Sequence, residues 1–265
     1  MLQSFENMVL SFATCAVSVL PMRKEASHRS EQVSQLLFGE RAEILQVQDE
    51  YWALVRSFAD DYEGWCLLGQ LQVITKKEFQ KEPKFYVSGH SNKLIGTEGE
   101  IILPAGAALK AGMIQLAKHK AKFKGKKIEI AELKPDVAQI EKIAQSFRYA
   151  PYQWGGRGLQ GIDCSGLSQL VLRLNGINIP RDASQQAMQG QTIAFLQEAR
   201  CGDLAFFGNA EGRINHVGIL LTEHTIIHAT ETAGCVVIDK IDQEGIVSKL
   251  LRKRTHTLRL IKRYF

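Results

Sequence analysis

The sequence predicts an α+β fold in which small all-β barrels precede a mixed domain. The first third of the chain holds short apolar runs at a spacing of roughly ten residues, with turn residues between them, which is typical of a small barrel. From about residue 137 onward, runs with helical periodicity come first and strand-like runs follow. Helices followed by an antiparallel sheet indicate an α+β domain.

Composition and charge narrow the classes of protein that fit. The 265 residues suit two domains or three small ones, and 45% hydrophobic with 23% charged residues is ordinary for a globular chain. A net charge of +5 is too small to argue for nucleic-acid binding, and no zinc-finger, RRM-like or basic-zipper pattern is present. The five cysteines are odd in number and include no CxxC pair, so we expect reduced thiols.

The ends and the charged runs suggest a cytoplasmic protein. Residues 1–20 contain apolar stretches, but Glu6 interrupts them and no basic segment precedes them, so we expect no signal peptide and no membrane span. Removal of a leader would instead make the protein a secreted one. The basic runs at residues 118–127 and 252–254 are interpreted as solvated charge, with an anionic polymer as the alternative partner.

The first barrel resembles a bacterial SH3 domain. Its expected strands follow one another through residues 16–21, 35–40, 41–47, 51–56, 64–68 and 71–74. The resemblance covers residues 12–75 and is carried by residues 21–27, 37–40, 51–55 and 62–65, which include a glycine–tryptophan pair.

The middle of the chain is less regular. Residues 85–88, 100–106 and 125–130 have the character of short strands, which fits a second, degenerate SH3-like barrel or a linker. Lys134, Pro135 and Asp136 mark the entry to a helix expected from about 137 to 148. We therefore divide the chain into domains at residues 1–78, 79–133 and 134–265.

Cys164 carries the clearest chemical signal. It stands in the sequence Asp163-Cys164-Ser165-Gly166, after a loop with four glycines at residues 154–161. The run that follows has helical periodicity and extends to about residue 175, so Cys164 is expected at a helix N-terminus. Backbone N–H groups there favour a thiolate and can stabilise an oxyanion, which suits a nucleophile.

A base for that thiol is expected on a following hairpin. His216 begins one strand-like run, residues 215–221, and His228 lies in the next, residues 225–230. A turn about Thr222 would place the two histidines directly opposite each other, on one face, with Cβ atoms roughly 4.5–5.5 Å apart. His216 would then take the thiol proton while His228 orients His216.

Plainer interpretations of these residues remain open at this point. A cysteine at a helix start is usually structural, and histidines of a hairpin are often surface residues. Cys164, His216 and His228 also have the ligand types that zinc prefers, although they include no closely spaced ligand pair. We therefore expect no metal and no cofactor.

Residues 137–240 resemble the NlpC/P60 cysteine peptidase family. Segments of the family pattern occur in order at residues 152–156, 161–167, 180–186, 202–207, 215–219 and 227–229. The resemblance implies a papain-like α+β fold and hydrolysis of peptide bonds in peptidoglycan stems. By position it makes Cys164 the nucleophile, His216 the base and His228 the third polar residue, and it places Tyr152 near the oxyanion.

The domain order resembles that of the γ-D-glutamyl-L-diamino acid endopeptidases, which also carry N-terminal SH3 modules. That resemblance implies a murein-derived peptide with a free N-terminal L-Ala as substrate, in cell-wall peptide recycling. We expect a monomer that contacts neither nucleic acid nor membrane. The substrate ammonium needs carboxylates or a ring face. The expected substrate-binding residues are Asp163, Ser165, Ser184, Tyr62 and Glu63. A helix N-cap is the alternative role of Asp163.

Other functions compete with recycling. The chain could be a secreted hydrolase that acts on intact peptidoglycan, with the SH3 modules as wall anchors. It could be a wall-peptide binding protein without activity, against which the complete set of Cys164, His216 and His228 speaks. An acyltransferase would share the Cys–His chemistry, but the SH3 fusion disfavours it.

Overall fold

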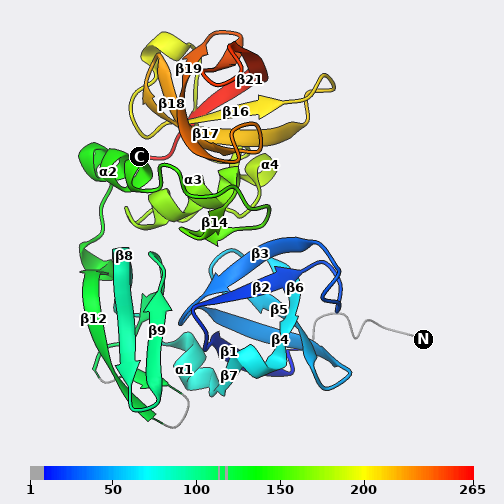
Figure 1. Cartoon of the computed structure of the whole chain (residues 1–265), viewed down its shortest axis with the longest axis vertical. Helices are drawn as coiled ribbons and strands as arrows, with labels where there is room; N and C mark the ends of the chain where they lie inside the picture. The colour runs from blue at the N-terminus through cyan, green and yellow to red at the C-terminus, as the bar shows by residue number, and fades with distance from the viewer. Residues whose placement is uncertain (1–8, 113, 117–118) are drawn as a thin grey trace. The chain divides into compact units, whose positions relative to one another are not determined.

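The computed structural model describes residues 9–112, 114–116 and 119–265 of the chain. It contains two compact units, one ending at Glu132 and the other running from Leu133 to Phe265 (Figure 1). No helix among these described residues is long and apolar enough to cross a membrane.

The N-terminal unit begins with a seven-stranded antiparallel sheet, in the spatial order β3-β2-β6-β5-β4-β1-β7. Six of its strands match the sequence-predicted runs to within a few residues. The seventh, β1, lies outside all of them because its mixture of Ser, Thr and apolar residues gives little alternation. Its strands are β1 (Ser11–Cys15), β2 (Val19–Arg23), β3 (Gln32–Leu37), β4 (Arg41–Gln48), β5 (Trp52–Ser57), β6 (Glu63–Leu67) and β7 (Leu71–Ile74).

Alternating side chains fill the interior of this first sheet. The pattern is clearest in β5, where Ala53 and Val55 are fully buried and meet Leu20 and Leu36 from neighbouring strands. Cys15 and Cys66 belong to the same cluster and act as small apolar residues. Their place in strand-like runs of the sequence is typical of such residues, whereas Cys235, also on a strand, is only half-buried.

A second sheet completes the unit after helix α1 (Lys76–Gln80). It runs in the order β10-β8-β12-β11, with β9 paired to β8, and the sequence-predicted strand segments fall on its longer members. Phe38 from the first sheet packs among Val87, Leu94 and Leu103, so the two sheets share a core. The strands are β8 (Phe85–Gly96), β9 (Gly99–Leu103), β10 (Ala108–Leu109), β11 (Ile114–Leu116) and β12 (His119–Glu129).

The C-terminal unit combines three helices with a seven-stranded antiparallel sheet, ordered β15-β21-β16-β17-β18-β19-β20. Because β20 also pairs with β21, six of these strands close into a ring. Helix α3 packs against β17 and β18 (Figure 1), and this α+β architecture confirms the predicted fold class. Its elements are α2 (Val137–Ser146), α3 (Cys164–Arg173), α4 (Ala183–Gln186), β15 (Gln191–Ile193), β16 (Leu204–Gly208), β17 (Ile214–Thr222), β18 (Thr225–Thr230), β19 (Cys235–Asp242), β20 (Gly245–Ser248) and β21 (Lys253–Arg263), with the short β13 (Arg157–Gly158) and β14 (Gly161–Ile162) before α3.

Candidate active site

Cys164 is the first residue of α3, as the sequence predicts. Asp163 caps the helix by accepting a hydrogen bond from the backbone N–H of Gly166 at 2.7 Å. The Cys164 sulfur accepts hydrogen bonds from the backbone N–H groups of Ser165 and Val217. Since Val217 directly follows His216 in β17, the first turn of α3 lies against the strand that carries the predicted base.

The Asp163 carboxylate accepts hydrogen bonds from several groups of the protein. Its carboxylate forms a two-pronged ion pair with Arg181, at 2.6 Å and 3.0 Å, and also accepts the backbone N–H of Gly155 at 2.8 Å. Ser165 is tied into the same group, because its hydroxyl accepts from Arg181 at 2.8 Å. Asp163 and Ser165 are therefore buried beside Cys164 as parts of one network, and their predicted contacts with substrate stay a prediction.

A close backbone approach holds the glycine-rich loop against α3. A Cβ atom on Gly166 would collide with the backbone carbonyl of Gly156, so only glycine fits in the first turn at this point. On the other side of that turn, Gln186 of α4 donates to the carbonyl oxygen of Ser165 at 3.1 Å. The helix start that presents Cys164 is thus fixed by contacts on two sides.

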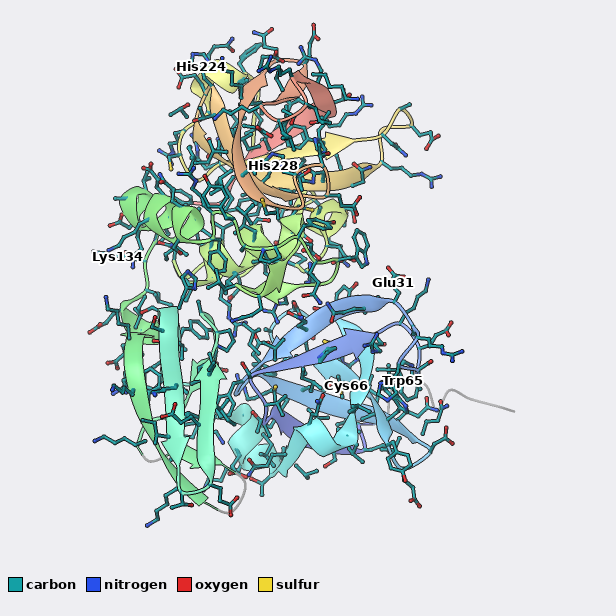
Figure 2. All side chains as sticks on the ribbon, in the orientation of Figure 1. Glu31, Trp65, Cys66, Lys134, His224 and His228 are labelled. Atoms are coloured by element: carbon teal, nitrogen blue, oxygen red, sulfur yellow. The ribbon has the colours of Figure 1, made fainter. Side chains whose placement is uncertain are left out.

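The two predicted histidines meet on one face of the sheet. His216 Nε2 and His228 Nδ1 are 2.8 Å apart, and both rings are buried (Figure 2 labels His228). The expectation that the residues oppose each other directly is wrong. The turn lies between Thr222 and Thr225, further along the chain than expected, and a bulge after Leu220 corrects the pairing by one residue. Ile219 then pairs with Ile227, so the ladder is displaced by two residues from the expected one. A shift of two preserves the face, and the histidines become diagonal neighbours.

Gly218 makes room for this diagonal contact. Extending the register by one residue from Ile219 and Ile227 places Gly218 opposite His228. A Cβ atom at Gly218 would come within 3.0 Å of the His228 Cβ and 2.6 Å of the Ile226 side chain. The absence of a side chain at this position therefore leaves the space that the Ile226 side chain and the His228 Cβ occupy.

Two further residues complete the polar group, the buried Asp239 and the half-buried His256, and the sequence patterns identified neither. Asp239 of β19 lies 3.3 Å from His228 Nε2, and the His256 ring of β21 stacks on His216 with centroids 4.1 Å apart. A possible signal for Asp239 is that this acidic residue directly follows an apolar run, residues 235–238. His256 follows a basic segment and carries no comparable signal.

Burial controls the protonation of the reacting groups. It raises the pKa of the Cys164 thiol to about 12, together with the charge of Asp163, and outweighs the Val217 and Ser165 N–H groups and Arg181. Burial likewise lowers the pKa of His216 well below its usual value, with His228 and His256 adding to the effect. The backbone N–H group of Ser165 at the helix terminus does lower the pKa of the thiol, as predicted, but burial has the larger effect. The resting pair is therefore a neutral thiol and a neutral imidazole.

Tyr152 lies close enough for the charges of Cys164 and Asp163 to act on its phenol. Burial raises the pKa of this phenol, those two charges add to the effect, and its hydroxyl hydrogen bonds to Glu231. Ser184 lies exposed on α4, outside the buried network. Tyr62 packs partly buried on the first core cluster and Glu63 pairs with Arg56 at 3.8 Å, both in the N-terminal unit.

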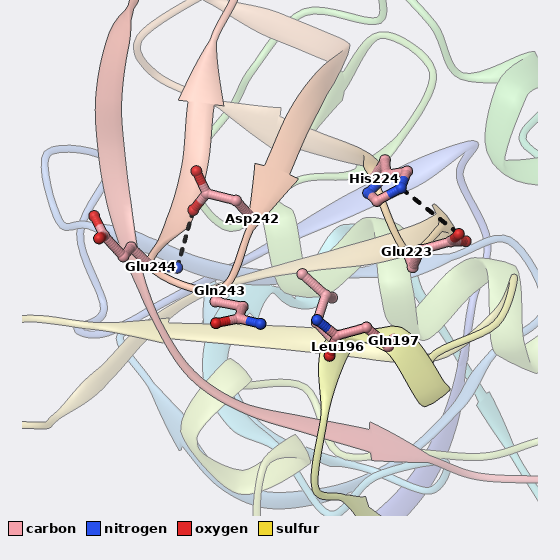
Figure 3. A pocket seen from close by; sticks show the side chains of 7 residues that line it. All are labelled: Leu196, Gln197, Glu223, His224, Asp242, Gln243 and Glu244. Atoms are coloured by element: carbon pink, nitrogen blue, oxygen red, sulfur yellow. Dashed lines mark hydrogen bonds and ion pairs between the residues drawn. The ribbon is translucent and has the colours of Figure 1, made fainter.

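A separate hollow of about 400 Å³ lies elsewhere on the C-terminal unit (Figure 3). It is lined by polar residues that include His224 and Glu223, 3.7 Å apart, and contains none of the predicted site residues. Among the described residues, no three His, Cys, Asp or Glu side chains are arranged to hold a metal ion.

Comparison with known proteins identifies both parts of the chain. Residues 149–255 match the NlpC/P60 family, and residues 22–71 match the bacterial dipeptidyl-peptidase SH3 domain. The chain is 27% identical to a gamma-D-glutamyl-L-lysine dipeptidyl-peptidase of Bacillus subtilis, over 77% of this chain and 74% of the relative. It is 27% identical to dipeptidyl-peptidase 6 of Lysinibacillus sphaericus, over 83% of this chain and 88% of that protein.

The fold agrees with these matches. The crystal structure of an NlpC/P60 family protein from Bacillus cereus has a TM-score of 0.78 at 18% identity, covering 96% of this chain and 99% of that one. The chain therefore carries an NlpC/P60 peptidase domain preceded by a bacterial SH3 domain of the dipeptidyl-peptidase kind.

Proposed function

We propose that this protein is a cysteine endopeptidase that cuts the bond between γ-D-Glu and the diamino acid in murein stem peptides with a free N-terminal L-Ala. The observation that carries the chemistry is the position of Cys164 at the start of α3, against β17 and its histidine. The matches to two dipeptidyl-peptidases support the choice of substrate.

The first chemical step would form a thioester. The Cys164 sulfur attacks the γ-carbonyl carbon of D-Glu while His216 removes the thiol proton, so the two neutral groups become charged only as the new bond forms. The C–N bond then breaks, and the amine of the diamino acid leaves with the proton that His216 returns. Water, activated by the same imidazole, hydrolyses the thioester and releases L-Ala-γ-D-Glu.

Two kinds of donor would stabilise the oxyanion. In the first turn of α3, the Ser165 backbone N–H donates to the Cys164 sulfur and is one candidate donor to the oxyanion. The Tyr152 phenol is a second candidate donor, and its neighbours keep it protonated by raising its pKa. We expect Tyr152→Phe to lower kcat by about 10- to 100-fold while changing KM little, as measured by product release.

The free ammonium of L-Ala would select recycled peptides over intact wall. Carboxylates recognise an ammonium well, and Asp163 and Glu63 are each candidates for this role. Ser165 and Ser184 would hold amide or carboxyl groups of the peptide. A cytoplasmic place in cell-wall peptide recycling follows from such a preference. We expect Glu63→Gln to raise KM for the free peptide severalfold while kcat changes little, as measured by product release.

Mass spectrometry tests the substrate. L-Ala-γ-D-Glu-meso-diaminopimelate is incubated with the protein beside the same peptide acetylated at its N-terminus. Release of L-Ala-γ-D-Glu from the free peptide alone is the expected result. Equal cleavage of both peptides would favour a hydrolase of intact peptidoglycan, and cleavage of neither by folded protein would contradict the proposed activity.

A further inference from the structure

Three buried polar side chains cross neighbouring strands in a single line. His216 of β17, His228 of β18 and Asp239 of β19 are each less than one-tenth exposed, and each is linked to the next at 2.8 Å and 3.3 Å. β18 pairs His228 with Val237, so Asp239 is displaced by two residues and shares the face of His228. The same diagonal step that joins the histidines therefore joins His228 to the carboxylate.

The hydrogen-bonding capacity of these groups fixes where the protons are. Burial acts to raise the pKa of Asp239, but the hydrogen bonds from His228 and from the Lys249 backbone hold it below the ordinary value, so Asp239 is a carboxylate. A carboxylate only accepts hydrogen bonds, so His228 Nε2 must carry a hydrogen. In the neutral ring His228 Nδ1 is then an acceptor, and its partner, His216 Nε2, must be the donor.

One consequence concerns the far nitrogen of His216. With hydrogen on Nε2, the neutral ring of His216 has its lone pair on Nδ1. That nitrogen is the one free to take a proton from Cys164. The reverse arrangement, with hydrogen on Nδ1, would leave His216 unable to act as a base toward the thiol.

We propose that Asp239 is a positioning residue that sets the tautomers of both histidines, so that Nδ1 of His216 is the catalytic base. The proposal rests on the proposed function of Cys164 and His216. When His216 gains the thiol proton, its positive charge is shared along hydrogen bonds that end on the Asp239 carboxylate. Asp239 touches neither substrate nor sulfur and acts through His228.

The backbone of Lys249 makes the proposal unusually easy to test. Its N–H donates to Asp239 Oδ1 at 2.9 Å, while Oδ2 faces His228. In an Asp239→Asn variant the amide oxygen is required by Lys249 N–H, so the NH₂ group turns toward His228. An NH₂ group donates, which forces hydrogen onto Nδ1 of His228 and, through it, onto Nδ1 of His216.

The experiment reads the tautomers directly by ¹⁵N NMR of histidine-labelled protein and compares kcat and KM of the same samples. We expect both His216 and His228 to carry hydrogen on Nε2 in the native protein and on Nδ1 in Asp239→Asn. We expect kcat to fall at least about tenfold with KM nearly unchanged, because a base of the wrong tautomer binds substrate as before. Asp242→Asn, an exposed aspartate at the end of the same strand, is the matched control and should keep native tautomers and rate.

Several results would overturn the proposal. Hydrogen on Nδ1 of His228 in the native protein would do so, and this reading needs no variant to fold. If the histidine tautomers change in Asp239→Asn but kcat does not fall, Asp239 has no positioning role in the reaction. The NMR reading is made on resting protein, so it is independent of the Cys164→Ala test, whose failure would sink the proposed function instead.

Discussion

At the scale of single residues, the site is a set of buried charges and dipoles that compensate one another. Asp163 lies next to Cys164 and would oppose a thiolate, and Arg181 balances it through a two-pronged ion pair. Both side chains are almost fully buried. Removing one partner would leave the other charge without compensation in a low-dielectric interior.

Replacement of Arg181 therefore has a clear expected cost. We predict that Arg181→Met lowers the free energy of unfolding by about 3–5 kcal/mol, because Asp163 is then buried as an unpaired charge. The measurement is urea unfolding of the full chain. Arg254→Gln is the control, since Arg254 pairs with Asp242 and Glu244 at the surface, and it should cost less than about 1 kcal/mol. Equal costs for the two variants would contradict this view of Asp163.

Loss of the nucleophile is the simplest residue-scale prediction. Cys164→Ala should lower the hydrolysis rate by about a thousandfold or more, since no thioester can form. The thermal unfolding midpoint should stay close to that of the native protein because alanine is smaller and introduces no polar group. Hydrolysis at an undiminished rate would remove Cys164 from the mechanism.

At the scale of elements, the diagonal register of three strands builds the polar line. The bulge after Leu220 shifts β18 along β17, and Gly218 leaves the space that the shift requires. Without the bulge, the pairing of Thr222 with Thr225 would continue and place His228 opposite Ile219, so the two histidines would lie on opposite faces of the sheet.

Gly218→Ala tests that arrangement. An added Cβ would press on His228 and Ile226, so we predict a kcat lowered by about tenfold or more and some loss of stability. Steady-state hydrolysis and urea unfolding together measure both effects. Gly158→Ala is a suitable control, because a Cβ there would meet only the Gln160 side chain, at 3.9 Å. An active Gly218→Ala variant with native kcat would show that the space is not needed.

The elements also show how far the sequence could predict the site. Helical spacing after Cys164 and a histidine at the start of a strand predicted α3 and β17, because both signals are local. The register of β17 and β18 depends on a bulge, which the sequence does not mark. Asp239 escaped prediction because its contact with His228 depends on the register of β18 and β19. His256 escaped because β21, distant in the sequence, reaches the site only through the closed ring of the sheet.

At the scale of the whole molecule, the buried histidines link folding to pH. Burial lowers the pKa of His256 to about 4, with His228 adding to the effect, and burial lowers the pKa of His216 well below 6.5. Below pH 6.5 the unfolded chain binds protons that the folded chain refuses. The lowered pKa values therefore cost the folded state nothing above pH 6.5. The free energy of unfolding decreases as the pH falls from 6.5 toward 4, because the unfolded histidines gain protons first.

Urea unfolding across this range measures the linkage. We predict that the free energy of unfolding decreases steadily from pH 7 to pH 4.5. His256→Phe, which keeps an aromatic ring beside His216 but cannot take a proton, should show a shallower decrease. A free energy that is constant or rises over this range would contradict the neutral state assigned to these rings.

The overall architecture was more predictable than the site. Strand-like alternation in the first third of the chain and helical periodicity from about residue 137 predicted an α+β domain after β barrels. Burial of one face imposes these two periods on the sequence. The second sheet was harder, since β8 and β12 include lysines and glycines that interrupt alternation. Its shared core with Phe38 is a long-range contact that no local pattern reveals.

Detection of an acyl-enzyme tests the central claim most directly. The protein is mixed with a p-nitroanilide joined to the γ-carboxyl of L-Ala-D-Glu, quenched in acid, digested and examined by mass spectrometry. We predict an L-Ala-γ-D-Glu group bonded as a thioester to the fragment that contains Cys164, and no adduct in Cys164→Ala. Release of p-nitroaniline at the same rate by both proteins, without any adduct, would contradict it.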